Sequence, residues 1–214
     1  MKPTKPVKHD RQSGPRAERL LRAARKLFLA KGYQGTTIRD ICRTARLSNG
    51  TFYFHFENKD AIYARIYEEC FQFLNDMLEQ AVRPDMPPLE RIETSMKTYV
   101  RYFVEHREMW DMLDVSYRRL SLPETLIRRF DAMLQTFSSY VHTAVEDYLT
   151  KTGLADRYDS RELALLLISS IDGLFYDLKQ GFFEDSIQSL SLERLVAGQI
   201  EIFKTFLTAT AKER

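Results

Sequence analysis

Apolar residues recur at the spacing of α-helices along most of the chain. From Arg16 to Lys31 they occupy one face, with arginine and lysine on the other, and Gly32 marks the end of the segment. A second amphipathic segment begins at Thr36 or Thr37 and covers about two and a half turns to Ala45. Further segments follow near residues 59–82, 89–103, 110–117, 123–153, 159–181 and 191–210. With one more short helix after Ala45, the pattern predicts an all-α protein of about nine helices.

The residues after Ala45 are open to two interpretations. Thr51 to Phe56 are rich in aromatic residues and nearly alternate, which also suits a β-strand. A strand here would have no neighbour in the sequence with which to pair, because helical patterns surround it. Ser48 is a favourable N-cap for a helix from Asn49 to about Phe56. Two short helices joined by a turn of three or four residues predict a helix-turn-helix, whose second helix enters the major groove of DNA.

The charge of the chain is unevenly distributed. The net charge of +2 combines a net charge of +9 over residues 1–60 with one of −7 over residues 61–214. A basic first part on an acidic second part indicates a polyanionic partner for the first part alone. A solvated basic face would give the same balance, so the charge supports the helix-turn-helix without establishing it.

Composition narrows the class of protein. Hydrophobic residues make up 44% of the chain, enough for a substantial core, but no apolar run is long enough to span a bilayer. The first residues are basic and contain proline without an apolar stretch, so we expect a flexible arm over residues 1–15 and no secretory signal. Cys42 and Cys70 both lie on apolar stripes, so we expect two buried thiols in a reducing cytoplasm.

An enzyme is the alternative from another class. His142 and Glu146 share one helix face at a spacing that could hold a metal ion, but no third ligand stands out. The chain has no glycine-rich phosphate loop, no nucleophile elbow and no cysteine cluster. We therefore expect no catalytic residue, no metal and no cofactor.

The N-terminal segment resembles the signature of the tetracycline-repressor (TetR) family over about residues 16 to 64. The resemblance rests on two runs of residues and their spacing. They are Gly32-Tyr33 with Gly35-Thr36-Thr37-Ile38-Arg39-Asp40-Ile41, and Ala45-Arg46-Leu47-Ser48-Asn49-Gly50-Thr51-Phe52-Tyr53 with His55-Phe56 and Asn58-Lys59. Asp172-Gly173 in the eighth expected helix is a further similarity. Arg46 departs from the family, which usually has glycine in this turn, and leaves the turn geometry open.

The resemblance implies roles for individual residues. Thr37 would cap the second helix and contact a phosphate, and Arg39 would reach a base or phosphate. Asn49, Gly50 and Thr51 would face base edges, whereas Phe52 and Phe56 would pack in the core and Phe54 would be exposed. Contacts to the DNA backbone would come from Tyr53, His55 and Lys59, although core packing is an equal alternative for Tyr53.

The resemblance also divides the chain into a DNA-binding domain over residues 16–60 and a ligand-binding and dimerisation domain over residues 61–214. It implies a homodimer that binds palindromic operator DNA and is released by a small hydrophobic effector. The candidate effector-binding residues are Tyr67, Phe71, Phe103, Trp110, Met112, Tyr117 and Phe137. The candidate dimer residues, from the last two helices, are Leu167, Ser170, Leu174, Leu195, Phe203 and Phe206.

Several alternatives stay open at this point. The sequence does not identify the effector or the operator, or separate a repressor from an activator. An architectural DNA-binding protein without an effector is a further possibility. Four arginines could receive an anionic part of the effector, although a solvated surface explains them as well: Arg118, Arg119, Arg128 and Arg129.

Overall fold

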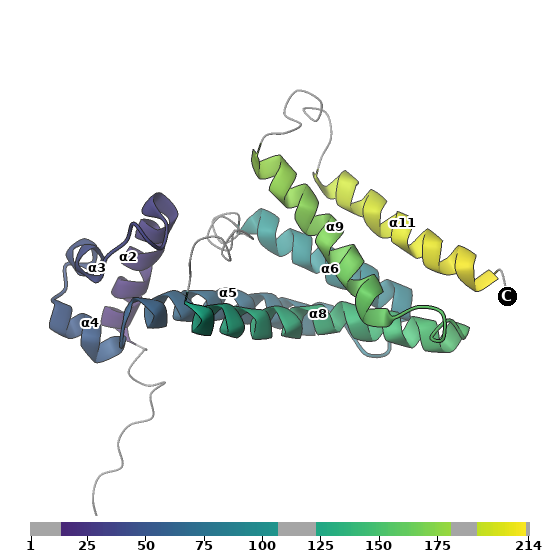
Figure 1. The fold of residues 1–214 in the computed structure, drawn as a ribbon, viewed down its shortest axis with the longest axis horizontal. Helices are drawn as coiled ribbons and strands as arrows, with labels where there is room; N and C mark the ends of the chain where they lie inside the picture. Colours follow the sequence, from purple (N-terminus) through teal and green to yellow (C-terminus); the bar gives the residue numbers. More distant parts are fainter. Residues whose placement is uncertain (1–13, 107–122, 181–191, 213–214) are drawn as a thin grey trace, which may run out of the picture. The chain divides into compact units, whose positions relative to one another are not determined.

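The computed structural model describes residues 14–106, 123–180 and 192–212, and these residues form helices without any strand (Figure 1). The eight helices are α2 (Pro15–Lys31), α3 (Ile38–Ala45), α4 (Asn49–His55), α5 (Lys59–Ala81), α6 (Pro88–Glu105), α8 (Glu124–Thr152), α9 (Ser160–Gln180) and α11 (Leu192–Lys212). The prediction of an all-α protein is confirmed, and residues 49–55 are helical rather than extended. The short helix expected near residues 110–117 lies outside the described residues.

Local signals in the sequence set several helix ends. Thr37 caps α3 in a complete capping box: its hydroxyl accepts from the Asp40 backbone N–H at 3.1 Å, and the Asp40 carboxylate faces the Thr37 N–H. Gly32 ends α2 with a positive φ of 70°, and its N–H donates to the Phe28 carbonyl. Asp159 caps α9 by accepting from the N–H groups of Arg161 and Glu162.

The chain forms two compact units, and α5 and α8 each contribute residues to both. The first unit takes its described residues from 1–70 and 107–132, and the second from 71–106 and 133–214. In the first unit, α2 packs on α3 and α4, and Leu20, Ile41 and Phe52 are completely buried between them. The boundary that we expected at residue 60 falls at the start of α5 and stays a prediction.

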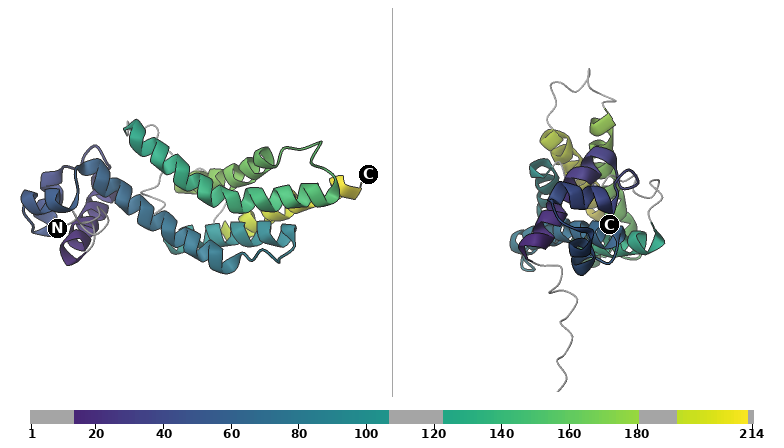
Figure 2. Two further views of the ribbon diagram at one scale, coloured as in Figure 1. Left: turned by 90° about the horizontal axis from the view of Figure 1, so that it is seen from below. Right: turned by 90° about the vertical axis from the view of Figure 1, so that its left-hand side faces the viewer.

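The second unit is held by an aromatic cluster around Tyr99. The Phe137 ring stacks on Tyr99 with centroids 4.3 Å apart, while Phe103 and Phe175 meet it edge-on. The Tyr99 hydroxyl donates to the Asp172 carboxylate at 2.6 Å, and burial raises the pKa of Asp172 to about 6. Helix α11 packs against both α6 and α9 (Figure 2).

Two further observations concern the described residues. Cys42 and Cys70 are both buried thiols, as expected. None of the described helices combines the length and apolarity that crossing a membrane requires.

Candidate nucleic-acid interface

The turn between α3 and α4 depends on a left-handed residue that is not glycine. Arg46 has φ 52° and ψ 48°, and it is the one non-glycine residue with positive φ in the described part of the chain. Its N–H donates to the Arg43 carbonyl, and the Arg19 guanidinium donates to the Ala45 carbonyl at 2.6 Å. These bonds satisfy the C-terminal end of α3. The turn therefore has the geometry that favours glycine, at a cost of roughly 1 kcal/mol for arginine.

Helix α4 separates a buried face from an exposed one within seven residues. Its start is capped by the Ser48 hydroxyl, which accepts from the Thr51 N–H at 3.1 Å. Phe52 and, just after the helix, Phe56 are buried, as expected, whereas Tyr53 and Phe54 are 58% and 60% exposed. Asn49 and Gly50 are also exposed. Packing against α2 and α3 thus fixes α4 while its polar start faces solvent.

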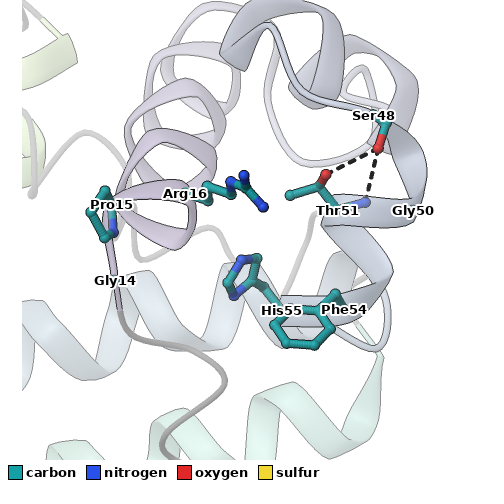
Figure 3. A pocket seen from close by; sticks show the side chains of 8 residues that line it. All are labelled: Gly14, Pro15, Arg16, Ser48, Gly50, Thr51, Phe54 and His55. Atoms are coloured by element: carbon teal, nitrogen blue, oxygen red, sulfur yellow. Dashed lines mark hydrogen bonds between the residues drawn. The ribbon is translucent and has the colours of Figure 1, made fainter.

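A hollow of about 630 Å³ lies between the start of α2 and α4 (Figure 3). Its lining residues are Gly14, Pro15, Arg16, Ser48, Gly50, Thr51, Phe54 and His55. The Arg16 side chain points from α2 toward Thr51 and His55 of α4 (Figure 3). The hollow therefore combines a cation, hydroxyl groups and an imidazole beside the predicted recognition helix, which suits a nucleic-acid backbone.

Lys59, at the start of α5, is turned toward protein. Its ammonium donates to the carbonyls of Tyr33 and Thr36 at 2.8 and 3.1 Å and lies 4.0 Å from the centre of the Tyr33 ring. Burial lowers the pKa of Lys59. These contacts fasten α5 to the segment between α2 and α3, so Lys59 positions the helix-turn-helix in this structure.

Thr37 and Arg39 lie at the start of α3. The Thr37 hydroxyl donates to the Asp40 carboxylate at 2.9 Å, so a phosphate would have to compete for that proton. Arg39 is exposed and has no partner among the described residues. The predicted interface thus consists of an exposed surface on α4 and exposed groups at the start of α3, with Lys59 behind them.

Arg16 and Ser48 line the hollow but are not among the DNA-binding residues predicted from the sequence. Ser48 was predicted only as a cap, and Arg16 only as the start of a helix. Their place beside Thr51 depends on the packing of α2 against α4, which helical periodicity within each segment does not specify.

The candidate effector-binding residues are divided between the two units. Tyr67 belongs to the first unit and stacks on Phe130, with centroids 4.0 Å apart. Phe71, Phe103 and Phe137 belong to the second unit and are also buried. Trp110, Met112 and Tyr117 lie outside the described residues.

The candidate dimer residues differ in exposure. Leu167 is 3% exposed and is therefore covered by its own chain, whereas Phe206 is 40% exposed and Ser170 is also exposed. Leu174, Leu195 and Phe203 are half-buried. The most exposed apolar residues of α9 and α11 were not on the predicted list: Leu165, Leu166 and Ile202 are 64%, 65% and 72% exposed.

His142, one of the two residues considered for metal binding, has another contact. The His142 Nε2 lies 3.0 Å from the Ser160 hydroxyl. Within residues 14–106, 123–180 and 192–212, no three histidine, cysteine, aspartate or glutamate side chains gather in a way that could hold a metal ion.

Comparisons with known proteins identify the N-terminal segment. Residues 20–66 match the model of bacterial regulatory proteins of the tetR family. The biofilm operon icaADBC HTH-type negative transcriptional regulator IcaR of Staphylococcus epidermidis is 27% identical over 171 residues, which cover 79% of this chain and 89% of that protein.

Solved structures share the fold over most of the chain. The transcriptional regulator FadR from Bacillus subtilis, solved with stearoyl-CoA, has a TM-score of 0.70 at 16% identity over 87% of this chain and 96% of that one. A tetR-family regulatory protein from Rhodococcus RHA1 has a TM-score of 0.68 at 22% identity over 89% of this chain and 96% of that one. The matched segment and the relative that covers most of the chain support a transcriptional regulator of the tetR family, and the solved structures show that the chain has a fold found in such regulators.

Proposed function

We propose that this transcriptional regulator is a repressor whose homodimer binds palindromic operator DNA and is released by a small hydrophobic effector. The observation that carries the proposal is the division of α4 into a buried face and an exposed face. Its apolar side is buried against α2 and α3, while Asn49, Gly50 and Tyr53 face solvent. A short, rigidly packed helix with a polar outer face is what major-groove binding requires.

The contacts with DNA are assigned by position and chemistry. Asn49, Gly50 and Thr51, at the start of α4, would face base edges. Tyr53 and His55 would contact phosphates, as would Thr37 and Arg39 at the start of α3. The net charge of +9 over residues 1–60 supplies the attraction to the DNA backbone.

A homodimer is supported by the exposed apolar side chains of α9 and α11. Leu165, Leu166 and Ile202 are mostly exposed in the single chain, although large apolar residues at these positions would be stabilised by burial. A Cβ atom added at Gly173 or Gly198 would meet only open space, so another helix could approach closely there. A second copy of the same two helices would bury this face symmetrically.

Repression and the class of effector are supported by comparison. The Staphylococcus epidermidis relative is named a negative regulator, which favours repression here. The structure of Bacillus subtilis FadR contains stearoyl-CoA, which favours an effector with a long apolar part, although the likeness to this chain is in fold. Arg128 and Arg129 pair with Glu124 and Glu68, so an anionic group would have to compete with these carboxylates. Arg118 and Arg119 lie outside the described residues.

Contacts of α5 with α2 and with the segment between α2 and α3 suggest how an effector would act on DNA binding. Arg25 pairs with Glu69, Tyr33 donates to Asp60, and Lys59 binds the Tyr33 carbonyl. These bonds fasten the first half of α5 to the helix-turn-helix, so a tilt of α5 would move both together. An effector that contacts Tyr67 or Phe71 and favours one tilt would change the spacing of the two recognition helices, and DNA would weaken its binding in return.

Genomic DNA selection with the purified protein tests DNA recognition. We expect enrichment of a palindromic site, with half-sites about one helical turn apart or somewhat more. Asn49→Ala should reduce operator affinity by roughly 1–3 kcal/mol and relax base preference, while Arg39→Ala should weaken all sequences alike. Equal binding of the wild-type protein to random and selected DNA would contradict the proposal.

Binding of the effector is tested separately. A thermal-shift screen with acyl-CoA esters, free fatty acids and aromatic drugs should identify compounds that raise Tm. The affinity for the best compound is then measured with and without operator. We expect operator to weaken it about 5- to 150-fold, and an unchanged Kd would show that this compound does not induce release.

A further inference from the structure

The hollow between the start of α2 and α4 gathers polar groups from two helices of the first unit (Figure 3). Arg16 comes from the first turn of α2, Thr51 and His55 come from α4, and Ser48 caps α4. None of the described residues that line the hollow is acidic. Its volume of about 630 Å³ is in the range of small-molecule sites, so it can accommodate a phosphodiester group. The hollow is therefore a basic recess of the right size for part of a nucleic-acid backbone.

Arg16 is held at this recess by the packing of α2. Its neighbours Ala17 and Leu20 are completely buried, so the start of α2 is fixed against the rest of the unit. Arg16 itself is exposed and forms no ion pair or hydrogen bond with the described part of the chain. Glu18 of the same turn is two positions away, and residues at that spacing do not face each other. A cation at the first turn also opposes the helix dipole, so we expect Arg16 to add little to stability.

The start and end of α4 supply hydrogen-bond donors. The Ser48 hydroxyl accepts from the Thr51 N–H at 3.1 Å and lies 3.0 Å from the Thr51 hydroxyl. One of these two hydroxyls donates to the other, which leaves one proton of this hydroxyl pair unused within the described residues. The His55 ring meets the Phe54 ring edge-on with centroids 5.0 Å apart, a contact that orients the imidazole. An imidazole has an N–H donor in either tautomer.

We propose that the hollow holds one backbone phosphate of the operator, bound by Arg16 from α2 together with the hydroxyl pair and the His55 imidazole from α4. The proposal rests on the proposed DNA binding and adds to it a contact from α2. DNA is the anion that the position favours, because Gly50 and Thr51 line the hollow and also belong to the segment that we assign to base edges. An arginine–phosphate contact is a strong, charge-assisted hydrogen bond. It positions the protein on the duplex without reading a base.

The test uses the full-length variant Arg16→Gln. Its matched control is Arg22→Gln, because Arg22 is exposed on the same helix but does not line the hollow. Affinity is measured over a range of salt concentrations on the selected operator and on copies in which one phosphate at a time is replaced by a neutral methylphosphonate. The Tm of all three proteins is measured without DNA.

We expect Arg16→Gln to bind the operator about 5- to 20-fold more weakly than wild type, with a salt slope lower by about one unit and an unchanged preferred sequence. Arg22→Gln should stay within about twofold of wild type, and neither variant should shift Tm by more than about 2 °C. One methylphosphonate in each half-site should weaken the wild-type protein by about 5- to 20-fold. The same replacement should weaken Arg16→Gln by less than about twofold, because the partner of that phosphate is already lost.

Three results would overturn the inference. The first is an Arg16→Gln variant that binds the operator as tightly as wild type, and the second is an equal loss for both proteins at every neutralised phosphate. The third is a clear fall in the Tm of Arg16→Gln, which would give Arg16 a structural role instead. Failure of the wild-type protein to select any site would contradict the proposed function itself.

Discussion

The helix-turn-helix and the α9–α11 pair expose opposite kinds of surface. Helices α2, α3 and α4 bury most of their apolar side chains and leave mainly polar and basic groups in water, apart from Leu29 on α2 and Tyr53 and Phe54 on α4. Helices α9 and α11 also bury an apolar stripe, but they leave Leu165, Leu166 and Ile202 exposed on another. A polar surface suits a hydrated polyanion, whereas exposed aliphatic groups suit a protein surface. The difference indicates that the two regions bind different classes of partner.

The sharpest contrast within the helix-turn-helix lies between Phe52 and Phe54. Phe52→Ala should destabilise the protein by about 3–5 kcal/mol, because the side chain is completely buried. Phe54→Ala should change stability by less than about 0.5 kcal/mol and should lower operator affinity, since the ring is 60% exposed beside the hollow. Urea unfolding measures the stability of both variants, and DNA titration measures their operator affinity. Similar losses of stability at the two positions would mean that α4 is not packed as described.

A charged substitution on the exposed face of α11 tests the dimer surface separately from the folding of each chain. Ile202→Glu should leave each chain folded but weaken dimerisation by about 2–4 kcal/mol, because the side chain is 72% exposed in the single chain and would be buried in the dimer. Operator affinity should fall with the loss of the second half-site contact. Val104→Glu, at a 45% exposed position of α6, is the control and should leave the assembly unchanged. Sedimentation of the wild-type protein as a monomer at micromolar concentration would refute the proposed dimer.

The raised pKa of the half-buried Asp172 should make the second unit sensitive to pH. Burial raises the pKa of Asp172 from 3.8 to about 6, so the folded state holds this proton more tightly than the unfolded state. The contribution of Asp172 to the free energy of unfolding therefore stabilises the folded state at low pH and is lost as pH rises from about 4 to 6. Asp172→Asn should raise stability at pH 8 by about 2 kcal/mol and change it little at pH 4, because the Tyr99 hydroxyl can donate to the amide oxygen. Thermal unfolding from pH 4 to 8 measures this difference. A larger gain at pH 4 than at pH 8 would contradict it.

The smallest expected effect concerns the left-handed turn. Arg46→Gly should stabilise the protein by about 1 kcal/mol, because glycine adopts φ 52° without steric cost. Arg46→Ala keeps the strained backbone and removes the charge, so it is the matched control. If Arg46 also contacts a phosphate, both variants should lower the salt slope of DNA binding by about one unit, while only the glycine variant raises Tm. A glycine variant that is less stable than the alanine variant would show that the left-handed backbone at residue 46 is not strained.

The sequence predicted most of the helix-turn-helix because its signals are local. The capping box at Thr37, the Ser48 cap and the spacing of Phe52 and Phe56 each depend on residues within one turn of a helix, and the structure confirms them. The identification of the family also follows from this segment, since its residues and spacing are specific. The all-α fold follows from periodicity that extends along the whole chain.

Only the tertiary structure decided which groups the long side chains contact. Lys59 was predicted to reach DNA, a role that stays a prediction, but its ammonium binds the carbonyls of Tyr33 and Thr36. Arg16 lies beside Thr51, and Leu167 is covered by its own chain while Leu165 is not. The sequence determines which face of a helix is apolar, because that depends on spacing along one segment. It does not determine which neighbour covers that face. Segments distant in the chain must first pack together, and only then does a cation such as Lys59 bind a carbonyl or an aliphatic side chain such as Leu167 become buried.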